Sequence, residues 1–178
     1  MRKIGSFALL LALALVPVAC DDDDNPAAPS APPTQYTLTA SLSPANEVPP
    51  VTTADAGASG TVTVTMTVTR DTAGAITGGS ANFTVNLAGF PANTTLTGAH
   101  IHSGAAGTNG GVQVNTGLTN GEVVLANGSG SFTKSNASVS AANANSLVTG
   151  ASGFYFNVHT QLNPGGAVRG QLAVTAQQ

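Results

Sequence analysis

The stretch from Thr61 to Thr69 alternates threonine with an apolar residue at every position. Its valines and Met66 therefore fall on one side of an extended chain and its threonines on the other, because successive side chains of a β-strand point to opposite faces. β-Branched residues also favour strands over helices. The stretch predicts a half-buried strand, and it restricts the domain to folds that contain a sheet with one covered face.

Similar alternation marks several other segments of the chain. Some show it clearly and others weakly, and together they are 82–87, 154–160, 167–174, 35–42, 96–102, 121–125 and 129–134. Turns rich in Gly, Asn and Pro separate these segments. About eight short strands joined by such turns predict an all-β fold, namely an antiparallel β-sandwich.

Two of the expected elements are predicted in more detail. In 167–174 we expect a single strand with its valines and its leucine on one buried face. Near 139–148 the pattern favours a short helix instead of a strand. Ser138 or Ser140 is expected to cap this helix at its N-terminus, and Gly150 is expected to end it.

The chain is poor in charged residues. Only 7% of its 178 residues are charged, against about 25% in an average soluble protein. The five lysines and arginines are too few for a phosphate-binding face, so nucleic acid is excluded as a partner. The single cysteine excludes an intramolecular disulfide framework and a Cys-rich zinc site. From Gln35 onward three basic residues stand against four acidic ones, so the domain has no electrostatic preference for a class of partner.

The first 19 residues have the features of a secretory signal peptide. Arg2 and Lys3 precede an apolar run over 7–19, which is shorter than the roughly 20 residues that a bilayer span needs. The run ends at Cys20, and this pattern resembles a bacterial lipoprotein signal in which the cysteine is lipidated. Pro17 stands where that pattern usually has Leu or a similar residue, so an ordinary signal peptide with a chance cysteine is the alternative.

Residues 20–34 are expected to form a tether between the lipid on Cys20 and a domain over 35–178. Asp21–Asp24 stay solvated because like charges repel one another, and the Pro- and Ala-rich part that follows favours extended structure. The acidic run is either a plain spacer or a sorting signal. This organisation predicts a protein anchored to the membrane of a bacterial cell envelope, on the periplasmic or the cell-surface side.

The three histidines offer the clearest chemistry in the domain. His100 and His102 are two residues apart, so on a strand they share a face with their backbones about 7 Å apart. His159 falls on the polar face of its own segment, together with Asn157. If these faces meet, three neutral imidazoles form a site for Cu or Zn. The alternative is that the histidines lie at the surface or hold adjacent loops through hydrogen bonds.

Glu47 and Arg169 are two of the few charged residues in the domain. Pro49 and Pro50 hold the chain extended just after Glu47. Glu47 is a candidate metal ligand or general base, and the alternative that we favour is an ion pair with Arg169. No constellation for nucleophilic catalysis is evident, since Ser103 lacks an acid partner. The sequence therefore favours a protein without enzymatic activity.

Four motifs, in this order, resemble the CHRD domain, a module that is repeated in the developmental antagonist chordin and found singly in many bacterial secreted proteins. They are Asn46–Pro50 (NEVPP), Gly98–Gly104 (GAHIHSG) with Gly107 and Asn109-Gly110, Tyr155–Thr160 (YFNVHT), and Asn163–Gly166 (NPGG) with Val168–Leu172 (VRGQL). The resemblance covers about 36–175 and implies an all-β domain with a poorly defined molecular function. In chordin the context is extracellular growth-factor binding, and no such partner is expected for a bacterial protein.

A weaker resemblance concerns the copper–zinc superoxide dismutase sandwich. The His-x-His pair, the Gly/Asn loop after it and a late Gly-x-x-Arg-Gly segment are similar to that family. This implies an immunoglobulin-like or superoxide-dismutase-like sandwich, copper ligands at His100 and His102, and Arg169 near an open copper position. His159 would supply a third ligand. The bridging histidine, the remaining zinc ligands and the disulfide are absent from the sequence, so the resemblance does not imply dismutase activity.

Three hypotheses of function follow. The first is a non-enzymatic binding module of the cell envelope or cell surface, for an unidentified protein or glycan. The second is a Cu- or Zn-binding metalloprotein that uses the three histidines, with Glu47, Asn157 and Arg169 around the metal. The third is that the histidines join Glu47, Asn157 and Arg169 in a polar network that only stabilises the fold.

Overall fold

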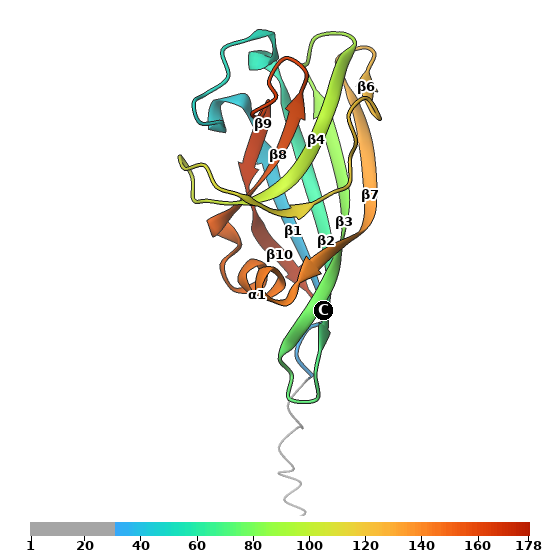
Figure 1. Cartoon of the computed structure of the whole chain (residues 1–178), viewed down its shortest axis with the longest axis vertical. Helices are drawn as coiled ribbons and strands as arrows, with labels where there is room; N and C mark the ends of the chain where they lie inside the picture. The colour runs from blue at the N-terminus through green and yellow to red at the C-terminus, as the bar shows by residue number, and fades with distance from the viewer. Residues whose placement is uncertain (1–30) are drawn as a thin grey trace, which may run out of the picture. The chain divides into compact units, whose positions relative to one another are not determined.

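Two antiparallel sheets pack face to face in the computed structural model, which describes residues 31–178 (Figure 1). The all-β sandwich predicted from the alternation is confirmed. The predicted signal peptide, Cys20 and most of the tether lie outside the described residues. Within residues 31–178, no helix has the length and apolar character needed to cross a membrane.

The first sheet has five strands in the order β10-β1-β2-β3-β7. Their bounds are β1 Gln35–Leu42, β2 Ser59–Arg70, β3 Ile76–Ala88, β7 Gly130–Ser140 and β10 Ala173–Gln177. The stretch that alternates from Thr61 to Thr69 is thus the centre of this sheet, because β2 pairs with β1 on one side and with β3 on the other.

The second sheet has the strand order β5-β4-β8-β9, and β6 pairs with β4. The bounds of these strands are β4 Thr94–Ser103, β5 Val112–Asn115, β6 Val124–Leu125, β8 Phe154–Thr160 and β9 Val168–Gln171. The remaining elements are helix α1 Ala141–Gly150 and the 3-10 turns η1 Pro44–Asn46, η2 Ala54–Gly57 and η3 Ala151–Gly153.

The core lies between the two sheets. Val62, Val64 and Met66 of β2 are at most 1% exposed, whereas the threonines between them point away from the core. Phe83 of β3 stacks on Phe156 of β8 with ring centroids 5.8 Å apart, so these two rings join the sheets. Burying a side chain of this kind contributes roughly 1.5–3 kcal/mol, and the alternation in both sheets supplies many of them.

The segment 167–174 is not one strand, contrary to the prediction. Val168 belongs to β9 in the second sheet and Val174 to β10 in the first. The chain changes sheets at Leu172, which is 1% exposed and whose backbone N–H donates to the carbonyl of Phe154 at 3.0 Å. The alternation continues through the crossing because Val168 and Leu172 lie in the core and Val174 packs against it, although Val168 and Val174 belong to different sheets. The pattern alone therefore does not reveal the break.

The structure has ten strands where the sequence predicted about eight. Strand β5 was not predicted, because its four residues contain too few alternations to stand out. Strand β7 runs through Ser140, so the helix begins at Ala141 and not near 139. Its predicted ends are otherwise correct, since Ser140 Oγ accepts from the backbone N–H of Asn143 at 3.2 Å and the helix stops at Gly150.

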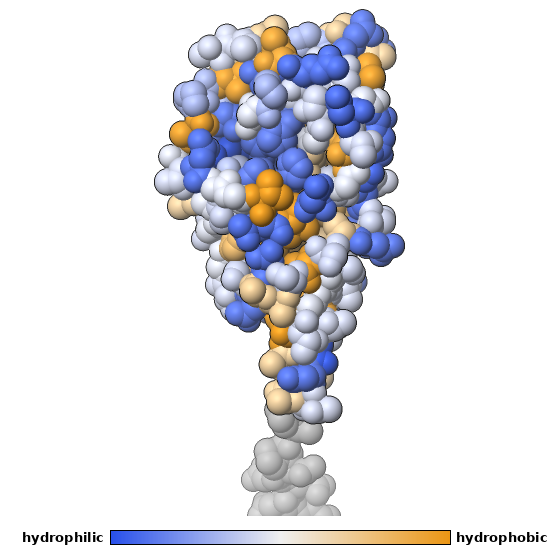
Figure 2. All heavy atoms as spheres, in the orientation of Figure 1, coloured by the Kyte–Doolittle hydropathy of each residue, from blue (hydrophilic) through white to orange (hydrophobic). Residues whose placement is uncertain are grey.

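Loops cover the outer face of the second sheet. The segments 43–58, 104–111 and 161–167 lie against it, and Tyr155 and Asn157 on that face are only 3% and 2% exposed. Both faces of β8 are therefore buried. Figure 2 shows hydrophilic and hydrophobic residues interspersed on the viewed side of the molecule and no single apolar patch.

Candidate metal centre

Strand β4 presents two imidazoles on the loop-covered face of the second sheet. His100 and His102 flank Ile101, which points to the core and is 1% exposed. The neighbouring strand β8 supplies His159, which is paired in the backbone register with Gly98 and not with either histidine. The three rings therefore meet diagonally across two strands, although His159 lies 57 residues after His102 and 59 after His100 in the sequence.

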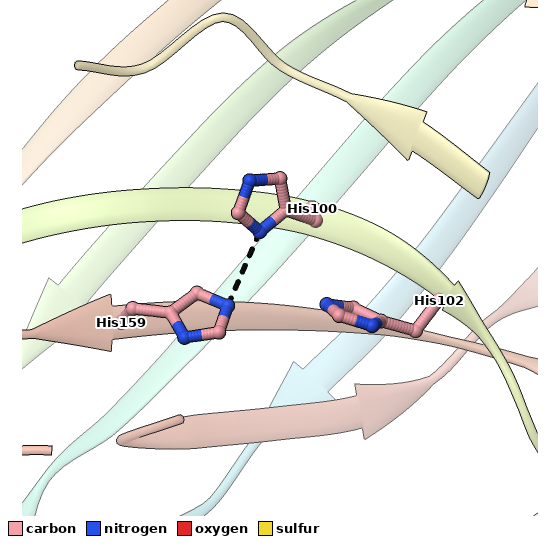
Figure 3. A group of neighbouring side chains, drawn as sticks. All are labelled: His100, His102 and His159. Carbon is pink, nitrogen blue, oxygen red and sulfur yellow. Dashed lines mark hydrogen bonds between the residues drawn. The ribbon is translucent and has the colours of Figure 1, made fainter. Parts of the chain in front are cut away.

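The three rings converge on one point in space. Nδ1 of His100 and Nε2 of His159 are 3.2 Å apart, and the ring of His102 points toward this pair (Figure 3). One nitrogen from each of the three rings lies within 4.8 Å of the other two. The sequence predicted a metal site only if the face of His100 and His102 meets the face of His159. In the structure these two faces meet.

Backbone carbonyls fix which nitrogen of two rings is free. Nδ1 of His102 is 3.0 Å from the carbonyl oxygen of Gly110, and Nδ1 of His159 is 2.9 Å from that of Pro164. A carbonyl only accepts, so both Nδ1 atoms carry the proton and both Nε2 atoms carry a lone pair. His100 Nδ1 then donates to Nε2 of His159. Nε2 of His102 is buried and has no hydrogen-bond partner in the described part of the chain.

Burial keeps the three histidines neutral. Burial, with the neighbouring His159 and His102 acting in the same direction, lowers the pKa of His100 to about 4. Burial also lowers the pKa of His102 and of His159, against the opposing effect of their hydrogen bonds to backbone carbonyls. Neutral imidazole is the form that binds metals.

Gly98 makes the convergence possible, and the sequence analysis did not assign it a role. A Cβ atom at Gly98 would lie 3.1 Å from Cε1 of His100, closer than side-chain contacts normally come. The ring of His100 therefore folds back over a position that has no side chain. The only sequence signal is the glycine's place two residues before the His-x-His pair.

Arg169 does not belong to the group of three histidines, but it supports them through Tyr155 and a neighbouring loop. Its guanidinium lies 3.9 Å from the ring centroid of Tyr155, and the ring of Tyr155 stacks on that of His102 at 5.0 Å with an interplanar angle of 4°. The guanidinium also donates to Asn109 Oδ1 and to the carbonyl oxygen of Thr108, both at 3.0 Å. Arg169 thus fixes both the aromatic support of His102 and the loop that contains Gly110.

The ion pair that we favoured between Glu47 and Arg169 is not formed. Lys134 and Glu122, 2.9 Å apart, make the only ion pair within residues 31–178. Glu47 instead accepts hydrogen bonds from Nδ2 of Asn157, at 2.9 Å to Oε1 and 3.2 Å to Oε2. The reason is local: Arg169 is already committed to the loop at 108–109 and to Tyr155.

Glu47 is a buried carboxyl group that contacts no counter-ion within residues 31–178. It is 6% exposed. Burial raises its pKa to about 7, although the positive charge of Arg169 acts in the opposite direction. Glu47 and Asn157 thus form a polar pair beside the histidines, and neither of them belongs to the group of three that could hold an ion.

Asp55 is a structural residue that the sequence analysis missed. It is 0% exposed, and its Oδ2 accepts from Thr160 Oγ1 at 2.7 Å and from Asn163 Nδ2 at 2.6 Å. These bonds hold the loop whose Pro164 carbonyl fixes His159. The available signal was weak: Asp55 is one of four acidic residues after Gln35.

The protein is thus an all-β sandwich domain with a candidate metal centre. Loops cover one of its sheets, and three histidines converge beneath them. A sequence model of the CHRD domain matches residues 38–172. The chain belongs to the CHRD domain family, as its four motifs predicted. No curated protein and no solved structure matches the chain. The likeness to copper–zinc superoxide dismutase stays a prediction that rests on the motifs alone.

Proposed function

We propose that this CHRD domain binds one copper or zinc ion through Nδ1 of His100, Nε2 of His102 and Nε2 of His159. The domain then acts as a non-enzymatic metal-binding module. The observation that supports this most directly is the buried, unpartnered Nε2 of His102, which faces two other imidazole nitrogens. Leaving a buried acceptor unpaired costs about 1–3 kcal/mol, and a metal ion removes that cost.

The hydrogen bonds around the site support the same proposal. Metal-binding histidines usually donate their second ring nitrogen to a carbonyl or carboxylate, which fixes the ring and its tautomer. His102 and His159 both do so. His100 would transfer its proton from Nδ1 to Nε2 when the ion binds, so that all three ligand atoms present lone pairs.

Ligand type favours copper over zinc, and the spacing of the ligand atoms is compatible with either ion. Imidazole suits both ions, and affinity among the divalent first-row metals is highest for Cu²⁺. Two nitrogens bound at 2.0–2.1 Å are at most about 4.2 Å apart, so the rings need to approach one another only slightly. In the described part of the chain the group contains no fourth His, Cys, Asp or Glu, which leaves a coordination position for an exogenous ligand.

Titration calorimetry of the full chain with Cu(II) and Zn(II) tests the proposal. The protein is purified in mild detergent and stripped with a chelator first. We expect one ion per chain with a sub-micromolar Kd, a Cu(II) electron paramagnetic resonance signal split by nitrogen ligands, and at least about 100-fold weaker binding in His102→Ala. Thr67→Ala, on the outer face of the first sheet, is the control and should bind as the wild type does.

Two outcomes contradict the proposal. One is a folded wild type that binds neither ion. The other is unchanged binding in His102→Ala and His159→Ala. If the wild type does not bind and each variant melts at a lower temperature in metal-free buffer, the histidines serve only the polar network of the third hypothesis.

We also propose that a lipid on Cys20 anchors this domain to a membrane of the cell envelope. The charged start, the short apolar run and the position of the single cysteine support this. Several acyl chains on one residue give stable anchoring, whereas one chain gives only marginal binding. Cys20→Ala should move the protein from the membrane fraction to the soluble fraction, and an unchanged distribution would contradict the anchor.

A further inference from the structure

A cavity of about 470 Å³ opens beside the histidines but does not include them. Three separate parts of the chain form it: the loop before β2, the loop after β4, and strand β9. The residues that line it are Ala45, Asn46, Glu47, Val48, Pro50, Ala106, Gly107, Arg169 and Gln171. Its volume is in the range in which proteins bind small organic molecules.

Glu47 is the most unusual group in the wall of this cavity. A carboxylate offers about four acceptor sites, yet the hydrogen bonds to this one come from a single nitrogen, Nδ2 of Asn157. A second cavity of about 280 Å³ also has Glu47 in its wall. A Cβ atom at Gly166 would lie 2.7 Å from both carboxylate oxygens, so a glycine keeps space open beside the group.

Each of the neighbouring polar side chains already donates at least one hydrogen bond within the protein. Asn46 Nδ2 donates to the carbonyl of Arg169 at 3.1 Å. Gln171 Nε2 lies within 3.2 Å of three backbone carbonyls, and both terminal nitrogens of Arg169 have acceptors. The acceptors left to a ligand are the Glu47 carboxylate and the amide oxygens of Asn46 and Gln171. A ligand that brings hydrogen-bond donors can pair with all of them.

Charge decides between two kinds of donor. An ammonium group would pair with the carboxylate, but the guanidinium of Arg169 is in the same wall and repels a cation. Hydroxyl groups donate without carrying charge. The apolar residues of the wall, among them Ala45, Val48 and Pro50, provide a surface for the C–H groups of such a ligand.

We propose that this cavity binds a neutral polyhydroxylated ligand, a saccharide unit, with Glu47 as its central hydrogen-bond acceptor. The chemistry is the same for a free sugar and for the end of a glycan chain. The inference does not depend on the proposed metal function, because no histidine lines the cavity. It gives the domain a second site on the same loop-covered face.

Saturation-transfer NMR and calorimetry on the full chain test this inference. The probes are maltose, cellobiose and N,N′-diacetylchitobiose, each with its monosaccharide, and spermidine serves as the cationic comparison. We expect at least one saccharide to bind with a Kd of about 1 mM or tighter. Glu47→Gln should weaken that binding at least about 10-fold, because the ligand hydroxyls then donate to a neutral amide oxygen in place of a charged carboxylate. Affinity that rises from monosaccharide to disaccharide would indicate a glycan chain, and equal affinity a free sugar.

Further variants make the result decisive. Ala106→Leu adds bulk at an exposed loop position in the cavity wall and should abolish binding even if Glu47→Gln were to fold poorly. Glu122→Gln, at the exposed ion pair with Lys134, should change nothing. The inference is overturned if no saccharide binds, if binding survives both cavity variants, or if only spermidine binds in a Glu47-dependent manner.

Discussion

The outer faces of the two sheets are built in opposite ways. On the first sheet, Thr39, Thr63, Thr84 and Thr133 stand opposite one another across four neighbouring strands, and three of these threonines are exposed to solvent. On the second sheet the corresponding face lies under loops and contains Tyr155, Asn157 and Arg169, none of them more than 3% exposed. On the first sheet the polar groups of the outer face form hydrogen bonds with water. On the second sheet they need hydrogen-bond partners from segments that are distant in the sequence.

The difference teaches where polar side chains can do chemistry in this fold. Solvent-facing threonines form a regular surface on which nearly any strand-forming residue fits. Under the loops, each polar group must find a partner or remain unpaired at a cost. The candidate metal centre and the Glu47 cavity both lie there, where burial shifts the pKa of the histidines and of Glu47 in opposite directions along the pH scale.

The largest expected effect compares two aspartates, one from each region. Asp55→Ala removes the acceptor of the buried Thr160 hydroxyl and of Asn163, and it should lower the free energy of unfolding by about 3 kcal/mol. Asp71 lies at the exposed turn between β2 and β3, where its Oδ1 accepts from two backbone N–H groups at 2.9 Å. Asp71→Ala should cost about 1 kcal/mol.

Urea unfolding followed by circular dichroism measures both variants. Equal losses of unfolding free energy would mean that hydrogen bonds under the loops of the second sheet stabilise the protein no more than those of a surface turn. The comparison between the two faces would then fail as an energetic statement.

The second prediction concerns Glu47 and pH. The pKa of its carboxyl is about 7 in the folded protein, against 4.5 as the ordinary value, so the folded state binds this proton more tightly than the unfolded state does. Glu47 therefore lowers the free energy of unfolding as the pH rises from about 4.5 to about 7, by about 2–3 kcal/mol. Glu47→Gln should remove this loss. Between pH 5 and pH 8 the stability of the variant should therefore rise relative to that of the wild type.

The wild type minus variant difference isolates this contribution. The histidines act with the opposite sign, because their lowered pKa values cost stability as the pH falls below about 6.5. Glu122→Gln is the control. A hydrogen bond from the backbone of Thr119 lowers the pKa of the Glu122 carboxyl, so this group titrates below the pH window of the measurement. A parallel pH dependence in wild type and Glu47→Gln would show that burial does not perturb the group.

The third prediction sharpens the view that the loop-covered face is adapted to bind a metal. Gly98→Ala places a methyl group 3.1 Å from Cε1 of His100 and should turn that ring away from His159. We expect Cu(II) affinity to fall about 10-fold while the melting temperature without metal stays nearly constant. Gly153→Ala, where a Cβ atom would meet nothing within 4 Å, is the matched control. Unchanged affinity in Gly98→Ala would show that the ring of His100 is not constrained by this contact.

How far the sequence predicts the structure depends on which face is considered. The strand centred on Thr61–Thr69 and the exact bounds of β1 and β8 follow from alternation, and capping rules narrow the helix cap to Ser138 or Ser140, of which Ser140 is correct. The break at Leu172 does not follow from alternation, because period two is the same in either sheet. Alternation tells which side chains share a face and says nothing about which sheet a strand joins.

The candidate site was predictable in its residues and only partly in its contacts. The shared face of His100 and His102 follows from their spacing, whereas the arrival of His159 depends on β4 pairing with β8. The ion pair between Glu47 and Arg169 was wrong because charge counting ignores competing partners such as Asn109. The roles of Gly98 and Asp55 depend on close contacts between distant segments, and no local pattern reveals such contacts.

The smallest expected effect tests the comparison with one substitution made twice. Thr63→Val keeps the β-branched shape on the exposed face of the first sheet, and it should change the free energy of unfolding by no more than about 0.5 kcal/mol. Thr160→Val makes the same change under the loops, where the hydroxyl donates to Asp55 and accepts from the backbone N–H of Asn163. There it should cost about 2 kcal/mol, because Asp55 Oδ2 loses one of its two donors and the backbone N–H of Asn163 loses its acceptor. Both variants replace a strand threonine by valine and lose the same hydroxyl. The difference between their thermal melts therefore measures how much the loops over β8 add to the cost. A small effect in both would mean that these loops move aside and admit water.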